Sequence, residues 1–88
     1  MASYSVKFKP SADRDLRSLP KVVVRRVLTA IEGLRSEAFP RSAIKLSGVE
    51  RLYRIRAGEY RIVYEIDVPA RQVVVHYVRH RRDVYRVL

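Results

Sequence analysis

The stretch YRIRAGEYRIVYEID, residues 53–67, restricts the fold more than any other part of the chain. Apolar and polar residues alternate on both sides of a Gly-Glu pair, which is the pattern of two half-buried β-strands. A two-residue loop with glycine first is typical of a type II′ hairpin turn, and such a short loop fixes the register of the strands. The sequence therefore predicts a hairpin in which Arg56 lies directly opposite Arg61.

The two faces of this hairpin differ in chemistry. One face is apolar and suits packing beneath helices: it carries Tyr53, Ile55, Ala57, Tyr60, Ile62 and Tyr64. The other face carries Arg54, Arg56, Arg61, Val63 and one acid, Glu65. Like charges that lie directly opposite each other destabilise a sheet by up to about 1 kcal/mol. A bound anion would remove this cost; the alternative is a solvated face on which Glu65 offsets Arg54.

The rest of the chain predicts one small α+β domain that spans residues 1–88. The periodicity indicates a strand over 4–8, a short helix with Ser11 as its N-cap, a helix over 21–36, a loop over 37–50 and strands over 51–57, 60–67 and 72–79. The simplest packing places both N-terminal helices on one face of a small antiparallel meander sheet. The opposite face, which carries the arginines, is then left open.

The net charge narrows the choice of partner. The 19 Lys and Arg residues exceed the 9 acidic residues by ten, which gives a formal charge of +10. Such a basic domain is typical of a protein that binds nucleic acid, the ribosome or an acidic protein, although a basic surface can also serve solubility alone.

The absence of cysteine excludes a disulfide framework and a cysteine-based zinc site. No apolar run suits a signal peptide or a membrane span, so we expect a cytoplasmic protein with no membrane partner.

Several motifs together resemble the RelE/ParE superfamily of toxins from toxin–antitoxin systems. They are SADRDLRSLP, KLSGVERLYRIRAGEYRIVYEID and VVVHYVRHRRDVY, which with the second helix cover almost the whole chain. The tight hairpin and the HRRDVY ending are more similar to the RelE branch than to the gyrase-poisoning ParE branch. The resemblance implies a RelE-like fold and a ribosome-dependent endoribonuclease that cuts mRNA. It also implies a cognate antitoxin, which we expect to present an acidic segment.

The resemblance also implies roles for individual residues. Arg61 matches the hairpin arginine of the RelE-type site, Arg81 matches the arginine of the following basic motif, and Tyr85 matches the C-terminal tyrosine near the scissile nucleotide. We expect these three residues to be catalytic. Arg54 and Arg56 stand where RelE-type enzymes often have lysines. We expect these two, together with Arg82 from the basic tail, to bind the substrate.

The expected reaction is attack of a ribose 2′-OH on the adjacent phosphate, for which no metal or other cofactor is expected. Arginine is a poor base because its pKa lies above 12, so proton transfer needs another group or the reaction must rely on charge stabilisation. His80 is the natural candidate because imidazole titrates near neutrality. His76, within a strand, has the setting of a structural histidine.

Two other functions compete with the RNase interpretation. A ParE-like protein would poison DNA gyrase without any nuclease activity, and arginine in place of lysine at 54 and 56 favours this alternative. A degenerate toxin would serve only as an antitoxin-binding corepressor. The presence of Arg61, Arg81 and Tyr85 favours the nuclease.

Overall fold

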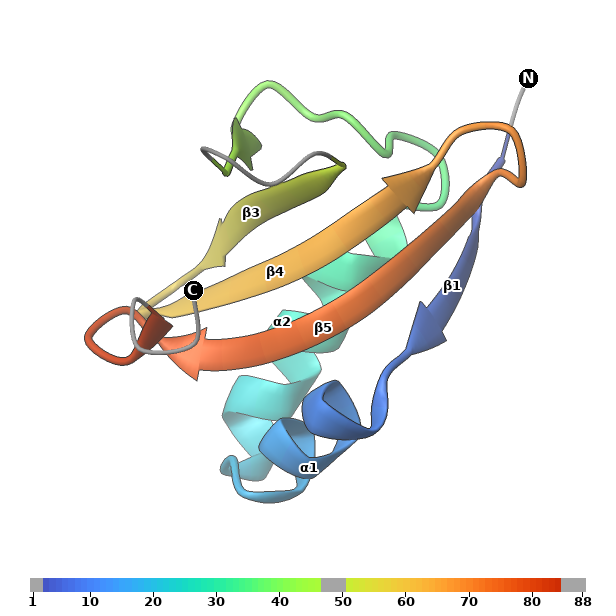
Figure 1. Cartoon of the computed structure of the whole chain (residues 1–88). Coiled ribbons are helices and arrows are strands. Elements are labelled where there is room, and N and C mark those ends of the chain that lie inside the picture. The colour runs from blue at the N-terminus through green and yellow to red at the C-terminus, as the bar shows by residue number, and fades with distance from the viewer. Residues whose placement is uncertain (1–2, 47–50, 85–88) are drawn as a thin grey trace.

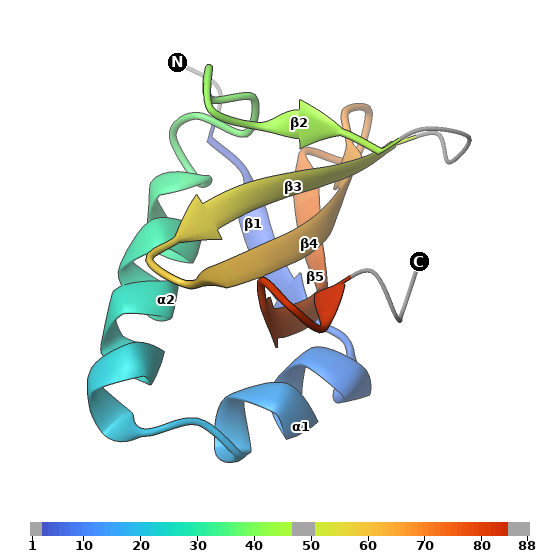
Figure 2. The same ribbon diagram turned by 90° about the vertical axis from the view of Figure 1, so that its left-hand side faces the viewer.

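The computed structural model of the protein describes residues 3–46 and 51–84. Along the chain these residues form β1 (Ser5–Phe8), α1 (Pro10–Arg17), α2 (Lys21–Gly33), β2 (Ile44–Lys45), β3 (Leu52–Ala57), β4 (Tyr60–Asp67) and β5 (Gln72–His80). The strands form one sheet in the order β1-β5-β4-β3-β2, and α2 crosses one face of it while α1 lies beside β5 (Figures 1 and 2). The predicted α+β fold, with two N-terminal helices packed on a small sheet, is confirmed.

The sheet differs from a pure meander at its two edges. β3, β4 and β5 are antiparallel neighbours as predicted, but β1 runs parallel to β5, so the sheet is mixed. The helical segment after β1 carries the chain to β2 at the opposite edge of the sheet, so β1 and β5 are neighbours without a direct connection. At the other edge, β2 pairs with β3 inside the segment that the sequence predicted as loop. Two residues are too few to show an alternating pattern, which explains why β2 was missed.

Of the two helices described, neither has the length and apolar character needed to cross a membrane.

The predicted hairpin register is confirmed residue by residue. Arg56 pairs with Arg61 across β3 and β4, and Ala57 pairs with Tyr60 next to the turn. Gly58 has a φ of 62°, whereas Glu59 does not lie in the positive-φ region, which agrees with a type II′ turn. A Cβ at Gly58 would lie 2.8 Å from the end of the flexible Arg26 side chain on α2, which can move aside, so the positive φ is the main reason that glycine is favoured here.

Tyr64, at the centre of β4, is the largest fully buried side chain of the core. Its ring stacks on Tyr53 with centroids 6.0 Å apart, and its hydroxyl donates a hydrogen bond to the Ala38 carbonyl at 3.2 Å. Burial, with a smaller contribution from the neighbouring Tyr53, raises the pKa of the Tyr64 hydroxyl well above its ordinary value. The hydroxyl therefore remains protonated and available as a donor, and it ties β4 to the chain that follows α2.

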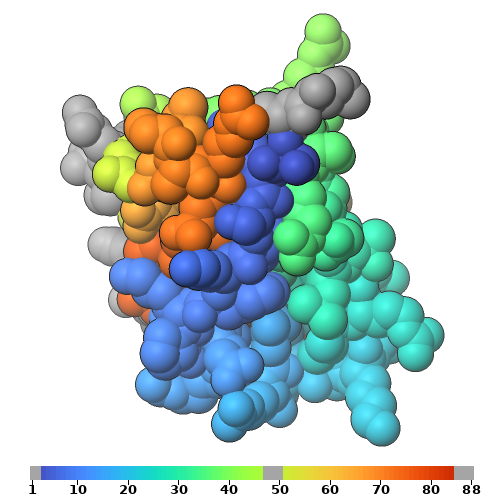
Figure 3. Space-filling model, turned by 90° about the vertical axis from the view of Figure 1, so that its right-hand side faces the viewer, coloured from blue at the N-terminus to red at the C-terminus, as the bar shows by residue number. Residues whose placement is uncertain are grey.

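Side chains of α1 form hydrogen bonds with the part of β5 that β1 does not pair with. β1 pairs only with residues 72–75 of β5, so the later backbone groups of β5 need other partners. Ser11 donates to the His76 carbonyl at 2.6 Å, and Asp15, one helical turn later, accepts from the Val78 amide at 3.0 Å. The predicted N-cap role of Ser11 is wrong, because Lys9 is the N-cap residue and Ser11 faces the sheet. The space-filling view shows α1 directly below β1 on this side of the molecule (Figure 3).

We expect Asp15→Ala to lower the free energy of unfolding by about 1–3 kcal/mol. Asp15 accepts hydrogen bonds from the Val78 amide and from Arg79 Nε, the latter at 2.8 Å, and its side chain is 13% exposed. Asp13→Ala is the matched control, since Asp13 is 55% exposed and pairs only with Arg17 in the described structure, an interaction worth at most about 1 kcal/mol. Urea denaturation of both variants measures the difference; equal losses would contradict a special role for Asp15.

Candidate functional site

Three of the arginines expected at the site lie on the face of the sheet that is turned away from the helices. Their neighbours along the strands, Ile55 and Ile62, belong to the core beneath the helices, and side chains alternate between the two faces. Arg54 and Arg56 on β3 and Arg61 on β4 therefore point the other way. This face is not open throughout, because Val63 on β4 is fully buried there.

These arginines line one pocket. The pocket has a volume of about 270 Å³ and is lined by Ser42, Ile44, Arg54, Ile55, Arg56 and Arg61. Side chains from β3 and β4 thus share one pocket with residues at and just before β2. The hairpin register predicted that these three arginines share one face, but the sequence did not predict the wall made by Ser42 and Ile44, because it treated their segment as loop.

Arg56 and Arg61 bring two guanidinium groups to this pocket. Within residues 3–46 and 51–84, neither Arg56 nor Arg61 has a carboxylate within ion-pair distance. Arg61 Nη1 donates instead to two carbonyl oxygens at the hairpin turn, those of Gly58 at 3.2 Å and Tyr60 at 3.1 Å. The pocket therefore has an excess of positive charge and exposed guanidinium donors, which is the chemistry that binds a phosphate.

The acids on this face are held by other partners. Glu65 pairs with Arg51 at 2.9 Å and with His76 Nε2 at 3.0 Å. Arg51 also lies 3.5 Å from Asp67. The acidic groups thus gather around Arg51, at the opposite end of β4 from Arg61.

Arg81 and Arg82 follow directly after β5, and Arg81 lies at the hairpin turn. Arg81 Nε pairs with Glu59 Oε2 at 2.9 Å, and the Arg81 amide donates to the Glu59 carbonyl at 2.8 Å. Arg61 donates to Gly58, the neighbouring turn residue, so the turn connects the two arginines, although Arg81 does not line the pocket itself. Arg82 is exposed.

His80, the last residue of β5, lies on the other side of the sheet from Arg61. It pairs in register with Tyr60, and the two rings contact each other edge to face with centroids 5.5 Å apart. Its Nδ1 accepts a hydrogen bond from the Arg82 amide at 3.2 Å. The structure therefore does not bring His80 together with the pocket arginines. Tyr85 lies outside the described residues.

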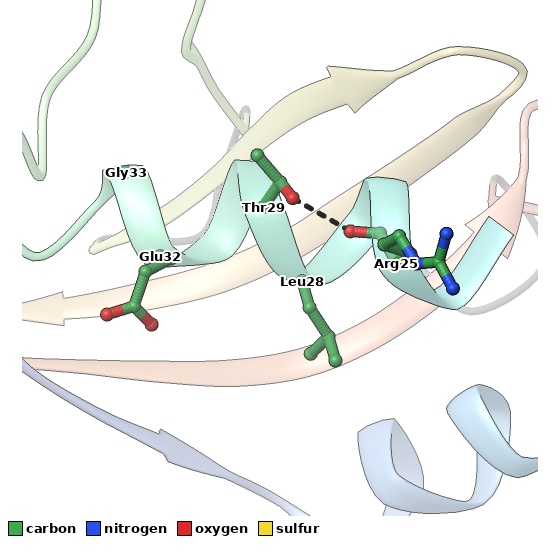
Figure 4. Close-up of a pocket in the computed structure, with 5 residues that line it drawn as sticks. All are labelled: Arg25, Leu28, Thr29, Glu32 and Gly33. Atoms are coloured by element: carbon green, nitrogen blue, oxygen red, sulfur yellow. Dashed lines mark hydrogen bonds between the residues drawn. The ribbon is translucent and has the colours of Figure 1, made fainter. Parts of the chain in front are cut away.

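A larger hollow lies on the outer surface of α2, and it lacks the features of a functional site. It has a volume of about 520 Å³ and is lined by Arg25, Leu28, Thr29, Glu32 and Gly33. These side chains point in different directions, and Thr29 is satisfied by the Arg25 carbonyl of its own helix at 2.9 Å (Figure 4). No set of polar groups converges here, so the arginine-lined pocket is the better candidate.

Comparison with known proteins gives consistent matches over nearly the whole chain. The sequence model of the family described as the ParE toxin of type II toxin-antitoxin system, parDE, matches residues 6–85. The chain is 33% identical to the toxin RelG of Mycobacterium tuberculosis over 88 residues, which covers 94% of this chain and 97% of RelG.

Two solved structures of complexes contain similar chains. One is the archaeal RelE-RelB complex from Pyrococcus horikoshii, with a TM-score of 0.79, 33% identity and coverage of 90% of this chain and 96% of that one. The other is the RelBE2 complex from Mycobacterium tuberculosis, with a TM-score of 0.78, 33% identity and coverage of 89% and 98%.

Proposed function

Because the chain belongs to the RelE/ParE superfamily of type II toxin–antitoxin toxins and is RelE-like, we propose that it is a ribosome-dependent endoribonuclease that cleaves mRNA. The observation that carries this proposal is the pocket that Arg54, Arg56 and Arg61 line together. RNA offers this pocket a phosphodiester, whose charge the pocket arginines can neutralise. Relatives named RelG and RelE support the RelE-like interpretation over gyrase poisoning.

In the proposed reaction the ribose 2′-oxygen attacks the adjacent phosphorus, the bond to the 5′-oxygen breaks, and a cyclic phosphate remains. Negative charge increases on the phosphoryl oxygens in the transition state. Guanidinium groups that are already in place stabilise that charge as it develops, without a cost for reorganisation. We assign this role to Arg61 and Arg56, with Arg54 binding the substrate from the same pocket. Arg81, beside the turn, and the exposed Arg82 would bind the neighbouring backbone, and Tyr85 would orient the scissile nucleotide.

No residue of the pocket is assigned to proton transfer in this mechanism. The ring of His80 lies against Tyr60, on the other side of the sheet from Arg61. We therefore propose that charge stabilisation and in-line orientation supply most of the rate, with His80 in a minor role.

His80→Ala is expected to lower cleavage by less than about tenfold. A group that transfers a proton in the transition state contributes about 10²–10⁴-fold, so the two possibilities are well separated. The measurement is the rate of mRNA cleavage from pH 5.5 to 8.5 for the wild type and the variant. A loss of 100-fold or more, together with a flattened pH profile, would assign proton transfer to His80.

The proposed function is tested by incubating the purified protein with a defined mRNA, with and without translating ribosomes, alongside a gyrase supercoiling assay. We expect cleavage only when ribosomes are present. Inhibition of gyrase without cleavage of mRNA would replace the proposal by the ParE-like alternative. Inactivity in both assays would favour the corepressor.

We further propose that a cognate antitoxin binds the chain and presents an acidic segment to the arginine-bearing face. The two solved relatives support the first part, because one is described as a RelE-RelB complex and the other as a toxin-antitoxin complex. The excess of arginine over acid around the pocket supports the second part, because complementary charge speeds and orients association.

A further inference from the structure

One wall of the arginine-lined pocket contains no charge. Ser42 and Ile44 form it, and Ile44 lies directly opposite Arg54 in the pairing of β2 with β3. Ile44 is 53% exposed although it is a large apolar residue. Ser42 is also exposed, and its hydroxyl has no hydrogen-bond partner within the described parts of the chain. An apolar surface and an unused hydroxyl thus lie next to the groups proposed to hold the phosphate.

We infer that Ser42 and Ile44 form the subsite for the base of the nucleotide whose phosphate the arginines hold. This inference rests on the proposed function and makes it more specific. A nucleotide in single-stranded RNA presents a flat, largely apolar ring and a polar edge beside its phosphate. Proteins recognise such unpaired bases by contact with the ring and by hydrogen bonds to its edge. Ile44 supplies the first kind of contact, and the Ser42 hydroxyl, which both donates and accepts, supplies the second.

The position of β2 makes this wall accessible to an extended strand of RNA. β2 is the edge strand of the sheet and contains only Ile44 and Lys45, so no further strand covers its outer side among the described residues. A strand of RNA can lie along this edge with its backbone toward the arginines and one base against Ile44. The arginines would then supply affinity for any sequence, whereas the β2 wall would supply the preference for particular bases.

The contact with the base is tested with fluorescent 2′-O-methyl tetranucleotides of A, C, G or U, which the proposed reaction cannot cleave because the nucleophilic hydroxyl is blocked. We expect Ile44→Ala to weaken the tightest of these complexes about fivefold to thirtyfold in fluorescence anisotropy, because up to three carbon atoms are removed from the contact. Ile44→Phe should tighten binding severalfold, because an aromatic ring can stack on a base. Val68→Ala is the matched control: Val68 is also 53% exposed but lies in the turn after β4, away from the pocket.

The contribution of Ser42 is tested by the differences in affinity among the four oligonucleotides. Ser42→Ala should reduce these differences while leaving the weakest affinity nearly unchanged, because a hydroxyl selects between base edges and does not contact the phosphate in the inferred arrangement. The distribution of cleavage sites on ribosome-bound mRNA should shift in the same direction. Circular dichroism establishes that each variant is folded.

The outcomes separate this inference from the proposed function. If wild-type protein cuts mRNA but the Ser42 and Ile44 variants match it in affinity and in cleavage sites, the subsite is refuted and the nuclease stands. If wild-type protein cuts nothing but the variants change oligonucleotide binding as stated, the subsite stands and the nuclease is refuted. Equal effects of Val68→Ala and Ile44→Ala would also refute the subsite.

Discussion

Replacement of Arg61 by alanine is expected to lower ribosome-dependent cleavage of mRNA by about 10²–10³-fold, the usual cost of removing one donor that stabilises developing charge. Arg61 lines the pocket from β4, has no acidic partner among the residues described, and is held toward the hairpin turn by hydrogen bonds to Gly58 and Tyr60. Its charge is therefore already in place before the substrate binds. The loss should appear in the rate at saturating ribosome concentration, because the interaction strengthens in the transition state.

Arg17→Ala is the matched control for this variant. It removes the same charge, but Arg17 lies on α1, where its side chain is 79% exposed and pairs with Asp13. We expect its cleavage rate to remain within a few-fold of the wild type. Equal losses in the two variants would show that net charge matters and that the pocket does not. A wild-type rate for Arg61→Ala would remove Arg61 from the site.

Replacement of Tyr64 by alanine should lower the free energy of unfolding by about 3–5 kcal/mol, the usual cost of truncating a buried aromatic side chain. Tyr64 is fully buried, stacks on Tyr53 and donates to the Ala38 carbonyl. Small domains are stable by only about 5–15 kcal/mol, so this loss takes a large share of the total. Urea denaturation followed by circular dichroism measures it.

Tyr64→Phe separates the hydroxyl from the ring. It keeps the packing and removes one hydrogen bond, so we expect a loss of about 0.5–1.5 kcal/mol. A loss in Tyr64→Phe as large as that in Tyr64→Ala would show that the bond to Ala38, and not the packing of the ring, holds this part of the core together.

The hairpin is the part of the fold that the sequence predicts best. A two-residue turn permits only one register, and the register decides which side chains share a face. The opposition of Arg56 and Arg61, and the burial of Tyr64 on the other face, follow from these two local rules. The structure shows both. The position of Arg54, Arg56 and Arg61 on one face was predictable for the same reason.

The features that the sequence did not predict depend on contacts between distant segments. Ser11 resembles an N-cap, but it bonds to His76, 65 residues later in the chain. β2 is too short to show a period, so the wall formed by Ser42 and Ile44 was not predicted. The burial of Val63 on the arginine-bearing face was also not visible, because the strand pattern alone does not show what covers that face. Tertiary packing decides the hydrogen bond of Ser11, the position of the β2 wall and the burial of Val63.

The central claim is that the pocket of Arg54, Arg56 and Arg61 holds the scissile phosphate of an mRNA. The most direct measurement is an electron cryomicroscopy structure of the protein on a ribosome whose mRNA has a 2′-O-methyl group at the cleavage position. We expect a phosphate whose oxygens lie about 2.7–3.2 Å from guanidinium nitrogens of Arg56 and Arg61. An mRNA backbone that passes elsewhere on the protein, with this pocket empty, would contradict it.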